Sequence, residues 1–235
     1  MASTPTNEST VIYALLGMTT VTGLVDAVSY LSLGHIFTAN MTGNIVFLAF
    51  ATAHVSGLSV VRSLTALLAF LTGAILGGRV MARTSADSQI RFAAQAFILE
   101  VAFLLAASFC GIGYRGDLLE HSFQSFALIA LTALAMGTRN AAVRKLGIPD
   151  LTTTVLTLTI TGIGADSSLA NGNNPRLARR IASVAAMFVG AALGAIAIHH
   201  SVSAALWLAT AISAVCSAAL SRRVRTADVQ SHSTQ

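Results

Sequence analysis

Residues 11–33 read VIYALLGMTTVTGLVDAVSYLSL, an apolar run that contains a single acidic residue, Asp26. A helix needs about 20 apolar residues to cross a hydrocarbon core about 30 Å thick, and this run is long enough. The rest of the chain has the same character, because hydrophobic residues make up 54% of it, charged residues 10%, and the mean hydropathy is +0.74. Soluble domains carry about 25% charged residues. The composition therefore places the chain in a lipid bilayer.

Six apolar segments have the length of a membrane crossing. They are residues 11–33, 64–80, 92–112, 123–143, 181–199 and 202–220. Two other segments are shorter or more polar, namely residues 38–53 and the threonine-rich residues 152–169. We predict an all-α, polytopic membrane helix bundle with six crossings, in which these two segments are broken or re-entrant. Eight full helices are the alternative.

The fourteen Lys and Arg residues favour the six-crossing layout. With eight crossings, the basic residues divide eight against six between the two sides, which indicates no orientation. With six crossings, only Arg62 and Arg115 lie opposite the termini, and the other basic residues share a side with them. Basic residues concentrate in cytoplasmic loops. We therefore predict a multi-pass protein with both termini in the cytoplasm.

Charge and cysteine usage exclude several other classes of protein. The net charge of +5 is spread in short clusters between apolar segments, which orient membrane helices and do not form a nucleic-acid-binding face. Cys110 and Cys216 lie within apolar stretches and have neither metal-ligand nor disulfide spacing. The first ten residues contain no Lys or Arg, so we expect no cleaved signal peptide. We expect the lipid bilayer as a partner and no cofactor, metal or nucleic acid.

The polar residues inside the apolar segments form two similar sets. The first set is Gly23-Leu-Val-Asp26-Ala27, Gly34 and Thr38-Ala-Asn40-Met-Thr42-Gly43-Asn44; the second is Gly137-Thr-Arg139-Asn140-Ala141, Gly147 and Thr152-Thr-Thr-Val-Leu-Thr157. The segments around Gly73 and Gly190 also match. We predict an internal duplication with repeat one at about residues 11–115 and repeat two at about residues 122–222. Six crossings make these repeats inverted, whereas eight would make them parallel.

Polar clusters at corresponding places in two halves are the usual mark of a transport site. We predict a substrate pathway formed by Asp26, Thr38, Asn40, Thr42, Gly43, Asn44, Arg139, Asn140, Thr154 and Thr157. Gly43 lets the backbone leave the helix, and a half-helix that begins there would present free amide groups to an anion. A polar turn at the membrane surface is the alternative.

Asp26 and Glu100 are the acidic residues that we expect at mid-membrane depth. Asp26 lies roughly 22 Å along the first helix, at a rise of 1.5 Å per residue. An ionisable residue there is costly and usually functional, so we predict proton coupling through Asp26 or Glu100. Two structural roles are the alternatives: Asp26 fastens helices together, and Glu100 forms a salt bridge with Arg139.

The two motifs resemble those of the YoaK-like family of bacterial inner-membrane proteins. The resemblance rests on Gly23-Leu-Val-Asp26-Ala27, the Thr42-Gly43-Asn44 triplet after Phe37, and Gly137-x-x-Asn140-Ala141 followed by a threonine-rich segment, and it covers most of residues 11–220. Membership implies a multi-pass inner-membrane protein and supplies no substrate. Arg139 stands where the resemblance leads us to expect a neutral residue such as Gln.

The motifs of common enzyme classes are absent from the sequence: no Gly-x-Ser-x-Gly elbow, no His-Glu-x-x-His and no Walker loop. We expect a membrane transporter, not an enzyme, that moves a small, anionic solute in a proton-coupled manner. The competing class is a non-transporting membrane scaffold or envelope-stress protein, whose polar residues only fasten helices. A cavity between the two motifs distinguishes the transporter from the scaffold. The sequence leaves open whether copies form a homo-oligomer.

Overall fold

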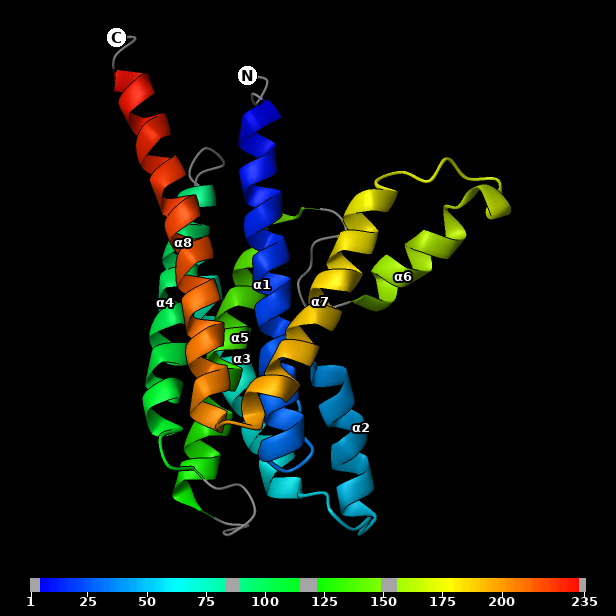
Figure 1. Cartoon of the computed structure of the whole chain (residues 1–235), viewed down its shortest axis with the longest axis vertical. Helices are drawn as coiled ribbons and strands as arrows, with labels where there is room; N and C mark the ends of the chain where they lie inside the picture. The colour runs from blue at the N-terminus through cyan, green and yellow to red at the C-terminus, as the bar shows by residue number, and fades with distance from the viewer. Residues whose placement is uncertain (1–4, 83–88, 115–121, 149–155, 233–235) are drawn as a thin grey trace.

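The computed structural model describes residues 5–82, 89–114, 122–148 and 156–232. Regular secondary structure within these residues is helical throughout (Figure 1). The helices are α1 (Pro5–Ser32), α2 (Met41–Thr52), α3 (Val60–Ala82), α4 (Gln89–Cys110), α5 (Phe123–Leu146), α6 (Leu156–Ala165), the short 3-10 helix η2 (Ser168–Ala170), α7 (Leu177–Ile198) and α8 (Val202–His232). The predicted all-α class is confirmed.

Six of the described helices are long and apolar enough to cross a membrane. These six candidate spans, one for each predicted crossing, are Ser9–Ser32, Val60–Ala82, Ile90–Cys110, Phe123–Leu146, Leu177–Ile198 and Val202–Arg222. By contrast, α2 has 12 residues and α6 has 10. At 1.5 Å per residue these short helices extend about 18 and 15 Å, well below the thickness of the hydrocarbon core. The chain is a multi-pass membrane protein.

The six long helices alternate in direction (Figure 1). Both chain termini lie at one end of the bundle, which we call the termini end, and the other is the opposite end. Helices α1, α4 and α7 run away from the termini end, and α3, α5 and α8 run towards it. Consequently α1 and α5 point in opposite directions, as do α3 and α7, and α4 and α8.

The segment between α1 and α3 enters the bundle and leaves it at the opposite end. The backbone N–H of Ala39 donates a hydrogen bond to Asp26 Oδ1 at 3.0 Å. Since Asp26 lies six residues before the end of α1 at Ser32, the chain has by then turned back along α1 by about 9 Å. Helix α2 then runs outwards to Thr52 (Figure 1). The chain between α1 and α3 thus turns back into the bundle and out again, and the predicted segment 38–53 contains the tip of this turn and α2.

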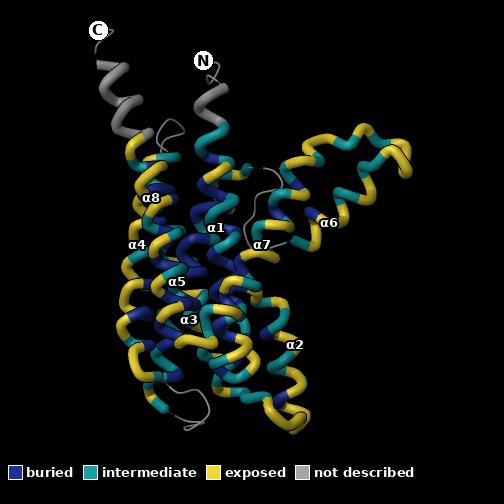
Figure 2. Tube along the Cα trace, in the orientation of Figure 1, coloured by how far each residue is buried: buried dark blue, intermediate teal, exposed yellow. Residues whose placement is uncertain are grey.

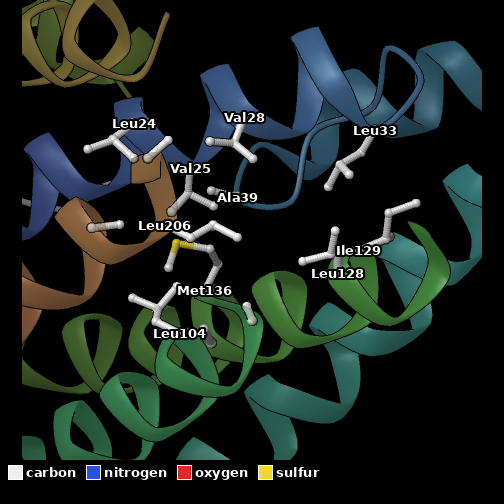
Figure 3. Close-up of a cluster of buried hydrophobic side chains, with 14 of the residues drawn as sticks. Leu24, Val25, Val28, Leu33, Ala39, Leu104, Leu128, Ile129, Met136 and Leu206 are labelled. Atoms are coloured by element: carbon white, nitrogen blue, oxygen red, sulfur yellow. The ribbon is translucent and has the colours of Figure 1, made fainter. Parts of the chain in front are cut away.

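Helices α1 and α5 are the most buried, and α3 and α7 form the outer faces (Figure 2). Large apolar side chains point outwards from α3 and α7, including Leu68, Leu71 and Phe188, as expected for surfaces that contact lipid. The interior is apolar along most of its length. One cluster joins α1, α4, α5 and α8 through side chains that include Leu24, Leu104, Met136 and Leu206 (Figure 3).

Glycines allow two pairs of helices to approach closely, α3 against α5 and α1 against α7. A Cβ atom on Gly73 of α3 would lie 2.2 Å from the carbonyl oxygen of Leu134 on α5, and one on Gly190 of α7 would lie 1.9 Å from that of Thr20 on α1. Both distances are far below van der Waals contact. Two further pairs of contacts correspond in the same way. A Cβ atom on Gly137 would meet the backbone of Phe70, as one on Gly23 would meet that of Met187. A Cβ atom on Gly77 would meet the backbone of Thr138, as one on Gly194 would meet that of Leu24. The two interfaces are therefore built from equivalent contacts, each joining the first half of the chain to the second.

Candidate functional site

A side-chain amide fixes the shape of the re-entrant loop. Asn44 is fully buried, its Oδ1 accepts a hydrogen bond from the backbone N–H of Phe37 at 2.8 Å, and its Nδ2 donates to the Phe37 carbonyl. The ring of Phe37 lies over Gly43, where a Cβ atom would come within 2.8 Å of it. Asn44 and Gly43 therefore shape the loop, and the bonds of Asn44 are used within the protein.

Asp26 connects α1 to the tip of this loop. Its carboxylate accepts the Ala39 N–H at 3.0 Å, and the neighbouring backbone amides of Thr38 and Asn40 also stabilise its negative charge. Successive backbone amides beside a carboxylate are favourable for its negative charge. The side chain of Asp26 is almost completely buried, and Thr38 Oγ1 beside it is buried without a hydrogen-bond partner. The loop amides that precede α2 thus face a carboxylate of the protein itself, that of Asp26.

A cavity of about 880 Å³ lies between the loop tip and the last turns of α5. The loop contributes Ala39–Thr42, α5 contributes Asn140, Ala141 and Val143–Lys145, and further walls come from Phe70, Ala74, Gly78, Gly147 and Ile148. Asn40, Thr42 and Asn140 supply neutral polar groups, and Arg144 and Lys145 supply positive charge. Acidic residues are absent among these lining residues. This cavity therefore lies between residues of the two polar motifs.

Local geometry places the basic end of α5 at this cavity. Gly147 adopts the left-handed conformation (φ 61°) that ends a helix, and its N–H bonds to the Val143 carbonyl. Arg144 and Lys145 consequently lie in the last turn, where positive charge is favourable. Asn140 Nδ2 donates to the Met136 carbonyl one turn earlier at 3.0 Å.

Arg139 lies away from the cavity in a fully buried ion pair. Its Nη1 lies 3.1 Å from Glu100 Oε1, and neither side chain is exposed. The guanidinium also donates to the Met18 carbonyl at 2.8 Å and to Thr22 Oγ1 at 2.6 Å. Arg139 therefore ties α5 to both α1 and α4. This is the salt bridge that the sequence offered as the alternative role of Glu100.

The second short helix, α6, packs against α7 through an arginine that sequence reasoning missed. Arg180 Nη1 donates to the Gly162 carbonyl at 2.5 Å, and Nη2 lies 2.8 Å from Asp166 Oδ2. The arginine is buried although Asp166 is partly exposed. Thr157 lies exposed on α6, and Thr154 is outside the described residues. The sequence does contain a sign of this contact. Arg180 lies in the first turn of an apolar helix, and Asp166, its ion-pair partner, precedes it in the chain.

The structure thus divides the predicted pathway residues into three groups. Asn40, Thr42 and Asn140 line the cavity, and Asp26 and Thr38 lie directly behind its Ala39 wall. Gly43 and Asn44 shape the loop, and Arg139 with Glu100 forms a separate buried pair. The cavity adds Arg144 and Lys145, which the motif comparison had not included in the site.

Comparison with known proteins identifies the family. The family model described as "Protein of unknown function (DUF1275)" matches residues 14–219. The chain is 39% identical to the UPF0700 transmembrane protein YoaK of Bacillus subtilis (strain 168) over 146 residues, which is 62% of each protein. No solved structure matches. These matches confirm the resemblance that the two motifs indicated, and the chain belongs to the DUF1275 family.

Proposed function

We propose that the protein is a small-molecule transporter of the bacterial inner membrane, and not an enzyme. The observation that carries this proposal is the cavity of about 880 Å³ lined by both polar motifs, the first through Asn40 and Thr42 and the second through Asn140. Its volume is within the range of about 300–1,000 Å³ that is usual for ligand sites. A scaffold whose polar residues only fasten helices has no need for such a space.

We infer that the chain consists of two inverted repeats, α1–α4 and α5–α8. The equivalent glycine contacts of α1 with α7 and of α5 with α3 support this inference. So do the opposite directions of α1 and α5, and the position of one short helix after each of them (Figure 1). Transporters commonly use inverted repeats with broken helices to form a substrate site near mid-membrane.

The charge of the cavity favours an anionic solute. Arg144 and Lys145 are positive, Asn40 and Asn140 are neutral, and the lining residues include no carboxylate. Helix α2 begins at Met41 with no acidic residue in its first turn, so the partial positive charge of its N-terminus also acts on this space. A cationic solute would find no compensating group among these residues.

Asp26 is the better candidate for proton coupling than Glu100. The Glu100 carboxylate is paired with Arg139, and neither side chain has access to solvent. Asp26 is instead hydrogen-bonded to the backbone of the loop that forms the cavity wall. Protonation of Asp26 would therefore change the loop that contacts the solute, whereas protonation of Glu100 would leave Arg139 as an unpaired buried cation.

Transport is tested by reconstitution of the purified protein into liposomes loaded with a mixture of metabolites. The variant Gly78→Leu should block exchange, because Gly78 lines the cavity and a Cβ atom there meets open space. The matched control is Gly164→Leu on α6, where a Cβ atom also meets open space but which does not line the cavity. The proposal is wrong if no solute crosses the membrane faster than in liposomes without the protein. It is also wrong if the two variants transport at the same rate.

A further inference from the structure

We propose that the cavity binds the carboxylate of an organic acid beside the re-entrant loop, and that each bound anion is accompanied by one proton taken up by Asp26. This inference rests on the proposed transport function and specifies its substrate class and its coupling. Two negative charges are involved. One is the carboxylate of the solute, and the other is the carboxylate of Asp26, which bonds to the cavity-lining residue Ala39.

The lining of the cavity matches both parts of an amphipathic acid. Met41 and Thr42, the first residues of α2, border the cavity, and no side chain caps their helix. Their amides belong to the first turn, where backbone N–H groups have no partner within the helix. The side-chain amide of Asn40, which also lines the cavity, offers a further donor. The opposite requirement, an apolar surface, is met by Phe70, Ala74, Val143 and Ile148.

These apolar walls distinguish an organic acid from an inorganic anion. A phosphate or sulfate ion would use only the polar end of a cavity of about 880 Å³. A monocarboxylate with a hydrocarbon or aromatic body would also bury apolar surface against Phe70 and Ile148, which is favourable. Arg144 and Lys145 at the end of α5 would attract the anion from solution and bring it to the loop.

Asp26 lies immediately behind the place where this carboxylate would bind. Its Oδ1 bonds to the N–H of Ala39, and Ala39 itself lines the cavity, so one layer of backbone separates the two acids. Water cannot screen two charges across packed backbone as it does at a surface. An ionised Asp26 therefore opposes the anion, and a protonated Asp26 does not. By thermodynamic linkage, anion and proton then bind together.

The other charged groups near α1 do not remove this opposition. The arginine that acts electrostatically on Asp26 is Arg139 of α5, and its charge is already matched by Glu100 of α4. On the neighbouring helices α7 and α8, the described charged residues are Arg179 and Arg180 in the first turn of α7 and Arg222 in the second half of α8. Arg62 of α3 lies against Gly34, where the loop begins at the opposite end.

A proton on Asp26 has a second effect on the loop. A neutral carboxyl group is a weaker hydrogen-bond acceptor than a carboxylate. The amides of Thr38, Ala39 and Asn40, which lie beside the Asp26 carboxylate, are then less firmly held. The next two residues of the same loop, Met41 and Thr42, border the cavity, so protonation of Asp26 changes the segment that would bind the anion.

Isothermal titration calorimetry of the purified protein tests the inference with propionate, hexanoate and benzoate and with their neutral amides. Titration in buffers of different ionisation enthalpy reports how many protons accompany each anion. We expect the acids to bind, the amides not to bind, and close to one proton to be taken up near neutral pH. The variant Asp26→Asn should bind the acids without proton uptake. Lys145→Gln should weaken binding several-fold at low salt, and Arg91→Gln, on α4 outside the cavity, should not.

Several results would overturn the inference and leave the proposed function intact. Amides that bind as tightly as acids would exclude recognition of the carboxylate. Unchanged proton uptake in Asp26→Asn would exclude Asp26 as the proton site. Liposomes that take up neutral or cationic solutes but none of the anions in the metabolite mixture would exclude the substrate class. If instead no solute is transported at all, the proposed function fails, and the inference fails with it.

Discussion

Arg139 and Glu100 form an ion pair at 3.1 Å in the middle of the bundle, and both side chains are completely buried. The Nε of Arg139 and the Oε2 of Glu100 have no hydrogen-bond partner within the described part of the chain. The pair is nevertheless well connected, because Arg139 also bonds to Met18 and Thr22 on α1. One arginine thereby links helices from both halves of the protein.

Removal of one charge from this pair should be more harmful than removal of both. Glu100→Gln leaves the Arg139 guanidinium unpaired in an apolar interior, which costs about 3–5 kcal/mol. The double variant Glu100→Gln/Arg139→Gln should recover much of that loss, since no buried charge remains. Thermal unfolding in detergent of both single variants and the double variant measures the coupling. Additive losses would show that the two residues do not depend on each other.

Replacement of Asp26 should separate its structural role from its proposed coupling role. Asp26→Asn keeps an oxygen that can accept from Ala39 but cannot carry a proton, so the protein should fold and proton-linked uptake should be lost. Asp26→Leu also leaves the loop amides without an acceptor, at about 1–3 kcal/mol for each buried group. Uptake into vesicles with an imposed pH gradient and thermal stability would be measured together. Normal proton-linked uptake by Asp26→Asn would make Glu100 the next residue to test.

The close helix contacts should make two glycines equally sensitive to a single methyl group. Gly73→Ala and Gly190→Ala place a Cβ atom at about 2 Å from a carbonyl oxygen of the facing helix, which forces α3 from α5 and α7 from α1. We expect losses of about 1–3 kcal/mol for each. Gly78→Ala, also on α3, meets nothing within 4 Å and should not lower stability. Thermal unfolding distinguishes these cases. Unaltered melting of both sensitive variants would contradict the close packing.

The six-crossing arrangement predicts which loops are accessible from each side of the membrane. In a variant lacking Cys110 and Cys216, a cysteine at Ser201 should react with an impermeant thiol reagent added outside intact cells. A cysteine at Asn173 should react only after the membrane is opened, because the termini end is expected to face the cytoplasm. Ser85, which lies outside the described residues, should behave as Asn173 does. Labelling of Asn173 from outside would refute this topology.

The sequence predicts the arrangement of helices better than the details of the site. Length and hydropathy suffice for the six crossings and for the two short segments, since both depend on physical dimensions of the bilayer. The ion pair of Arg139 with Glu100 could be predicted, because an unpaired charge inside a bilayer is costly and these two opposite charges lie at the same depth. The role of Asn44 was not, because its partner is the backbone of Phe37 and every residue has the same backbone groups.

Asp26 shows the same limit. Its depth in the membrane was evident from its distance to Val11, but its partner was not, because the turn that returns Ala39 to its side involves backbone conformation. Arg144 and Lys145 were assigned to a cytoplasmic loop as orienting charges. Their place at the cavity depends on the exact residue at which α5 ends, and hydropathy locates helix ends only to within a few residues.

The glycine contacts between α1 and α7 and between α3 and α5 also bear on how the protein is made. Each of these interfaces joins a helix that is synthesised early to one that is synthesised late. Helices α1 and α3 therefore enter the membrane before the surfaces against which they pack exist. During this interval the faces that carry Gly23 and Gly73 lack the helices that cover them in the folded protein. Assembly is thus completed only when the last two helices arrive.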